Sequence, residues 1–112
     1  MLLFLFQSCK EENNSSLFST KNEVNIILKN RSGKKINSVL LQHEKGTKKY
    51  LSLTNNTNAT ITFNTPGENA YTLTVTFDDG KKIQSKETYI ESGYRMIETI
   101  HRDKIETKYT IW

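Results

Sequence analysis

Apolar and polar residues alternate with a period of two along most of the chain after Glu23. In the clearest stretch, from Tyr71 to Phe77, large apolar side chains occupy every odd position and threonines every even one. Successive side chains of a β-strand point to opposite faces, so this alternation predicts a strand with one buried face. Asp78-Asp79-Gly80 follows and predicts a tight hairpin, because glycine tolerates positive φ. The return strand is expected at Lys82–Ile90, where the alternation is less regular.

Similar short segments recur along the rest of the chain, separated by turn-forming residues. Further strands are predicted at Val24–Leu28, Ile36–His43, Tyr50–Leu53, Ile61–Phe63, Tyr94–Ile100 and Ile105–Ile111. Seven to eight short strands at this spacing are typical of an antiparallel β-sandwich, so we expect an all-β domain of immunoglobulin-like or transthyretin-like type. The Cys…Trp…Cys pattern of immunoglobulin domains is absent, since the sequence has one cysteine. No segment carries the apolar stripe of a long helix.

The N-terminal residues follow a different pattern. Met1–Phe6 is a compact apolar run, and Gln7, the small residue Ser8 and Cys9 come directly after it. Six residues are too short to cross a membrane as a helix, whereas a short apolar core before a small residue is typical of a secretory signal.

The segment Leu5-Phe6-Gln7-Ser8-Cys9 resembles the lipobox of bacterial lipoproteins. This resemblance implies that residues 1–8 are a signal peptide that is removed, and that Cys9 is acylated and becomes the first mature residue. Two or three acyl chains would hold the protein stably at a membrane, whereas one chain alone is marginal.

The residues after Cys9 are polar and lack periodicity. Lys10, Glu11 and Glu12 resemble the export signal of surface-exposed lipoproteins in some Gram-negative bacteria, although a solvated charged linker has the same composition. We therefore expect a lipidated, flexible tether over residues 9–22 and a β-sandwich domain over residues 23–112. The expected location is the outer membrane, with the domain at the cell surface or facing the periplasm.

The charge balance does not indicate a nucleic-acid partner. The chain has 16 Lys and Arg against 12 Asp and Glu, a formal net charge of +4. Its lysines are scattered over several predicted turns, whereas a nucleic-acid surface concentrates them beside aromatic platforms. Solvated turns and protected strand edges account for them better.

The sequence predicts no catalytic residue, metal site or cofactor. His43 is expected to be exposed at a strand end, and His101-Arg102-Asp103 to form a turn. Asp78 and Asp79 supply too few oxygens for a hard cation. The motifs that place a nucleophile beside a base are missing, so we expect a protein that is not an enzyme.

Tyr89, Glu91 and Tyr94 form a candidate binding edge around the turn at Gly93. Tyrosines are enriched at interfaces, but one of them could equally be a corner tyrosine whose hydroxyl caps the backbone. The pattern from Lys29 to this cluster is similar in a general way to small bacterial β-proteins.

These features together predict a non-enzymatic binding or assembly module that is anchored by lipid. Its expected partner is an envelope protein or a glycan. The alternative is an immunity or inhibitor lipoprotein that neutralises a toxin directed at the envelope.

Overall fold

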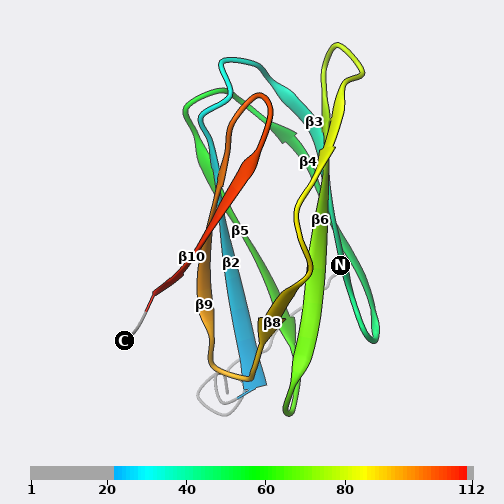
Figure 1. The fold of residues 1–112 in the computed structure, drawn as a ribbon, viewed down its shortest axis with the longest axis vertical. Coiled ribbons are helices and arrows are strands. Elements are labelled where there is room, and N and C mark those ends of the chain that lie inside the picture. Colours follow the sequence, from blue (N-terminus) through cyan, green and yellow to red (C-terminus); the bar gives the residue numbers. More distant parts are fainter. Residues whose placement is uncertain (1–21, 111–112) are drawn as a thin grey trace, which may run out of the picture.

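The computed structural model describes residues 22–110, and this part of the chain folds into nine β-strands (Figure 1). The strands are β2 (Glu23–Asn30), β3 (Ile36–His43), β4 (Gly46–Leu53), β5 (Asn58–Asn64), β6 (Asn69–Phe77), β7 (Lys82–Gln84), β8 (Thr88–Ile90), β9 (Arg95–Ile100) and β10 (Ile105–Thr110). None of the described residues belongs to a helix that is long and apolar enough to cross a membrane.

The strands form two sheets that pack face to face as a sandwich (Figure 1). One sheet has the order β10-β9-β2-β5, and the other has the order β4-β3-β6-β7 with β8 also paired to β6. The predicted all-β sandwich is thereby confirmed. One pairing departs from the expected antiparallel arrangement, because β2 and β9 run parallel, with Asn25 opposite Arg95. Parallel neighbours require a long connection, and here six strands lie between them in the chain.

The core lies between the two sheets and follows the alternation in the sequence. Val24, Ile26 and Leu28 are fully buried on β2. The predicted strand from Tyr71 to Phe77 is confirmed as the greater part of β6, and its odd-numbered side chains are buried. β2 and β6 are interior strands of their sheets, and every second residue of each is buried along the whole strand.

The predicted return strand at Lys82–Ile90 is instead two short strands, β7 and β8. Ser85 causes the break, because its hydroxyl oxygen accepts a hydrogen bond from the backbone N–H of Leu73 at 2.8 Å. The backbone N–H of Ser85 donates to the carbonyl of Leu73 at 2.9 Å. A side chain thus takes the place of a backbone acceptor, and the regular ladder stops. The hairpin before β7 turns at Asp78, Asp79 and Gly80, and the glycine adopts a φ of 92°.

Asn30, at the end of β2, holds two connections between the sheets. Its side-chain amide donates to the carbonyls of Lys34 at 2.8 Å and Leu53 at 3.0 Å. Its backbone N–H donates to the carbonyl of Thr57 at 3.0 Å, and its own carbonyl accepts from Asn56 at 2.8 Å. The turn from β2 to β3 and the corner from β4 to β5 therefore meet at one fully buried residue.

We expect Asn30→Ala to lower the free energy of unfolding by about 1–3 kcal/mol, because the carbonyl of buried Leu53 loses this donor and the turn at Lys34 loses a second hydrogen bond. Urea unfolding would measure the change. Asn58→Ala is the matched control, since Asn58 is exposed and its side chain accepts only a 3.3 Å contact from Arg31 in the described residues. It should stay within about 0.5 kcal/mol of the wild type. Equal effects of the two substitutions would contradict this role of Asn30.

Candidate functional site

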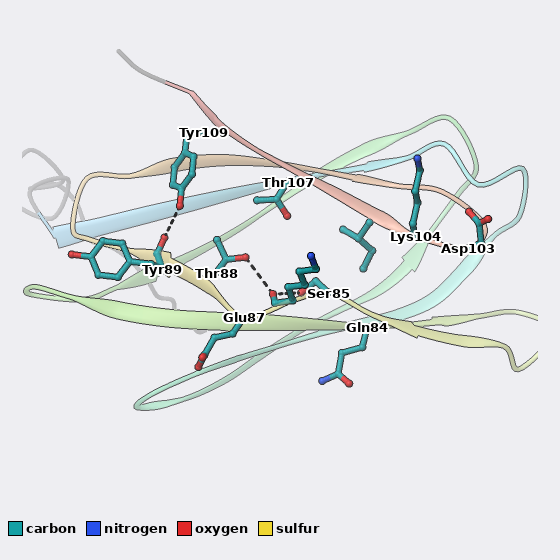
Figure 2. A pocket seen from close by; sticks show the side chains of 11 residues that line it. Gln84, Ser85, Glu87, Thr88, Tyr89, Asp103, Lys104, Thr107 and Tyr109 are labelled. Carbon is teal, nitrogen blue, oxygen red and sulfur yellow. Dashed lines mark hydrogen bonds between the residues drawn. The ribbon is translucent and has the colours of Figure 1, made fainter.

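The two flanks of the sandwich differ. On one flank β4 and β5 contact each other and are joined by the corner that Asn30 holds. On the other flank β10 ends one sheet, and β7 and β8 end the other. A groove of about 570 Å³ lies between them, lined by residues 84–89 and by side chains of β10 and its preceding turn (Figure 2). We call this side of the molecule the open flank.

The open flank has an aromatic end and a charged end. Figure 2 shows Tyr89 and Tyr109 at one end of the groove and Asp103 and Lys104 at the other. Thr107 lies between the two ends on β10. The groove therefore offers ring surfaces, hydroxyls and charges of both signs along its length.

Three tyrosines form the aromatic end. The rings of Tyr89 and Tyr94 meet edge to face with centroids 6.4 Å apart, and those of Tyr94 and Tyr109 do so at 5.7 Å. The hydroxyl of Tyr89 donates to the Glu91 carboxylate at 2.6 Å. Tyr89 and Tyr109 remain 45% and 55% exposed, so much of their ring surface faces solvent. Edge-to-face contacts are a favoured arrangement of aromatic rings and stabilise the cluster.

The structure therefore brings together Tyr89, Glu91 and Tyr94, the three residues that the sequence singles out as a candidate binding edge. Tyr109 joins them from β10 and was missed. Its place on the inner face of the last strand was visible in the sequence, but not the position of that strand beside β8. The alternative role for one of these tyrosines is to cap the backbone through its hydroxyl. In the structure Tyr109 makes such a bond, because its hydroxyl donates to the backbone carbonyl of Tyr89 at 3.2 Å.

A polar contact between the sheets lies behind the groove. Glu98, fully buried on β9, accepts a hydrogen bond from the hydroxyl of Tyr71 on β6. The hydroxyl of Thr107 on β10 donates to the other carboxylate oxygen at 2.6 Å. Sequence reasoning missed Glu98, although a glutamate between Met96 and Ile100 on the inward positions of a strand was a visible signal. We call these three residues the Glu98 contact.

Burial determines the protonation of the Glu98 contact. Burial raises the pKa of Glu98 above its usual value, and the hydrogen bonds from Thr107 and Tyr71 oppose this effect. Burial also raises the pKa of Tyr71, as does the negative charge of Glu98, so the phenol stays protonated as a donor. A carboxyl enclosed by its own donors is suited to holding two sheets together.

The two hairpins at the charged end are joined by an ion pair. Arg102, in the turn between β9 and β10, donates to both carboxylate oxygens of Asp79, in the turn between β6 and β7. Its guanidinium also lies 4.8 Å from the centre of the Phe77 ring. The hydrogen bond from Arg102 holds the pKa of Asp79 below its usual value. Both sequence segments form turns, as predicted.

His43 lies away from the open flank and is half-buried, more enclosed than the sequence predicted. Its ring stacks on Phe63 of the opposite sheet with centroids 4.4 Å apart. Burial lowers the pKa of His43, and the charge of Lys48 lowers it further. Among residues 22–110, no three His, Cys, Asp or Glu side chains are grouped so as to hold a metal ion. Cys9, Lys10, Glu11 and Glu12 lie outside the described residues.

Comparison with known proteins adds a likeness of fold. The chain is similar to the NMR structure of a protein from Eubacterium rectale, with a TM-score of 0.59 and 14% identity over 82% of this chain and 92% of that one. No protein-family model matches the sequence, and no curated protein matches it.

The raised pKa of Glu98 makes the stability of the fold depend on pH. Between the ordinary pKa of 4.5 and its raised pKa in the fold, Glu98 keeps a proton in the folded protein that the unfolded chain loses. The stability that this carboxyl contributes is therefore fully present below pH 4.5 and is lost as the pH rises through the raised pKa. We expect the free energy of unfolding of the wild type, relative to that of Glu98→Gln, to fall as the pH rises from about 4 to 8.

Urea unfolding across this pH range would measure the difference. Glu87→Gln removes an exposed carboxyl on the same flank and is the matched control, which should keep the wild-type profile. Parallel profiles for the wild type and Glu98→Gln would contradict the assignment.

Proposed function

We propose that the protein is a non-enzymatic binding or assembly module of the bacterial envelope, anchored by lipid at Cys9 and interacting through its open flank. The observation that carries this proposal is the open flank itself. An unpaired strand edge is a template for another strand, and here it lies beside exposed tyrosines. Such an edge offers backbone donors and acceptors in a row, which favours a protein partner over a glycan.

The shape of the other edges supports the choice of β10. β7 has three residues, and β4 contains Ser52 with a φ of 64°, which interrupts a regular edge. β10 pairs with β9 over six residues without a register shift, and it has β9 as its one partner strand among the described residues. β5 lies on the flank that its contact with β4 closes.

The anchor part of the proposal rests on the lipobox-like sequence and makes a direct prediction. The wild type should incorporate a palmitate analogue and partition into detergent, because its Cys9 thiol is acylated, and Cys9→Ser should do neither. The double variant Cys9→Ser with Ser16→Cys is the matched control, since it keeps one thiol outside the lipobox and should also stay unlabelled. Equal partitioning of the wild type and Cys9→Ser would refute the anchor.

The flank part of the proposal is tested by photocrosslinking in the cells that make the protein. A photoreactive amino acid replacing Tyr89 or Tyr109 should give a discrete covalent adduct, because both side chains are exposed on the open flank. Leu51 on β4 is the matched control, since it is a large apolar residue, 63% exposed, on the other flank. Adducts at Leu51 alone, or at no position, would refute the open flank as the interaction surface.

A further inference from the structure

The hydrogen bonds around β9 determine which backbone groups of β10 point outward. The backbone N–H of His101 donates to the carbonyl of Lys104 at 2.9 Å, so these two residues form a hydrogen-bonded pair. In antiparallel strands such pairs alternate with non-hydrogen-bonded pairs. Ile105, Thr107 and Tyr109 therefore direct their N–H and C=O groups away from β9. The same alternation is seen on the other side of β9. There the carbonyls of Tyr94 and Ile100 point toward β2 and accept hydrogen bonds from the backbone N–H groups of Asn25 and Arg31.

We propose that the partner of the open flank is a second copy of this chain, which pairs antiparallel with β10 through the same strand. The two four-stranded sheets would join into one continuous sheet around a two-fold axis at Thr107. This inference rests on the proposed function, since it names the partner of the same surface.

The sequence of β10 is complementary to itself in this register. With Thr107 opposite Thr107 of the second copy, Glu106 lies opposite the second copy's Lys108, and the reciprocal pair repeats the contact. On the inner face Ile105 lies opposite the second copy's Tyr109. Opposite charges, Thr–Thr pairs and pairs of an aromatic with a β-branched residue all stabilise neighbouring strands.

Neighbouring registers lose this complementarity. The outward N–H and C=O groups of the two copies pair only when Ile105, Thr107 and Tyr109 lie opposite one another in some combination. The nearest alternative registers therefore place Thr107 opposite Ile105 or opposite Tyr109 of the second copy. One such register places Glu106 opposite Glu106 of the second copy, and the other places Lys108 opposite Lys108. Like charges directly opposite each other are destabilising. The charges of β10 therefore favour the register centred on Thr107.

The side chains on both faces of β10 are available for this pairing. Glu106 and Lys108 are exposed on the outer face. One carboxylate oxygen of Glu106 lies 2.9 Å from Nε2 of His101, and the other lies 3.7 Å from Nζ of Lys104. The Glu106 side chain still remains 57% exposed. No acidic partner of Lys108 is present in residues 22–110. On the inner face the hydroxyls of Thr107 and Tyr109 donate to the Glu98 carboxylate and to the Tyr89 carbonyl, so neither hydroxyl occupies the outward backbone groups of β10.

Cysteine pairs test the register in the full chain carrying Cys9→Ser, which has no other thiol. Residues opposite each other in a non-hydrogen-bonded pair have Cα atoms about 4.5 Å apart, within disulfide range. A mixture of Glu106→Cys and Lys108→Cys should therefore form a mixed disulfide roughly tenfold faster than either variant links to itself. Identical residues at 106 or at 108 are diagonal neighbours about 7–8 Å apart, at or beyond disulfide reach. Self-linking as fast as mixed linking would refute this register.

Charge reversal tests the pairing without a covalent link. In sedimentation velocity at low salt, Lys108→Glu should raise the dimer dissociation constant about tenfold or more, because two attractive pairs become repulsive. The double variant Glu106→Lys with Lys108→Glu should return it to within about threefold of the starting value. Lys49→Glu on β4 changes the net charge equally and should leave the constant unchanged. A monomer at all concentrations, or no rescue by the double variant, would overturn the inference.

Photocrosslinking at position 109 distinguishes a failure of self-pairing from a failure of the open flank as the interaction surface. An adduct with the mass of two chains supports self-pairing. An adduct of another mass, together with no mixed disulfide, would refute self-pairing and keep the open flank as an interaction surface. Absence of any adduct from the flank together with monomeric protein would refute both.

Discussion

The fold depends on the burial of two apolar sheet faces against each other. β2 and β6 supply its centre, since each lies inside its sheet and buries every second side chain along its length. Because the side-chain period of a strand is two, a slip of one residue would move the buried set of a strand to the solvent face. The alternation of the sequence thus specifies which face of each strand belongs to the core.

The apolar interior is interrupted at the Glu98 contact. An aliphatic side chain at this position of β9 would fit the pattern set by Met96 and Ile100, but a carboxyl with two hydroxyl donors stands there instead. A buried carboxyl is costly unless it is hydrogen-bonded, so both donors are needed. One donor comes from each sheet, and the contact therefore fixes β10 relative to β6. This polar arrangement lies at the boundary between the core and the open flank.

Local pattern predicted the strands and turns well, but not the way in which they assemble. The alternation from Tyr71 to Phe77 and the turn at Gly80 follow from neighbouring residues, and the structure has both. The split between β7 and β8 depends on the hydrogen bond that the Ser85 hydroxyl oxygen accepts from the backbone N–H of Leu73, which belongs to another strand. The tyrosine cluster likewise needs β10 beside β8, a long-range arrangement that local periodicity does not encode. The contacts of Tyr109 with Tyr89 and Tyr94 and the buried position of Glu98 therefore came from the structure and not from the sequence.

The parallel pairing of β2 with β9 has a consequence for how the chain folds. β2 is the first described strand in the chain, and one of its two neighbours, β9, lies near the other end of the chain. β2 is therefore paired on both sides only after β9 has formed. Contacts between distant segments require loop closure before they contribute stability, so such topologies fold slowly. Until β9 pairs with it, one edge of β2 has no neighbouring strand. A partly folded chain that has β2 but not yet β9 in place therefore presents an extra unpaired edge to which another chain could add.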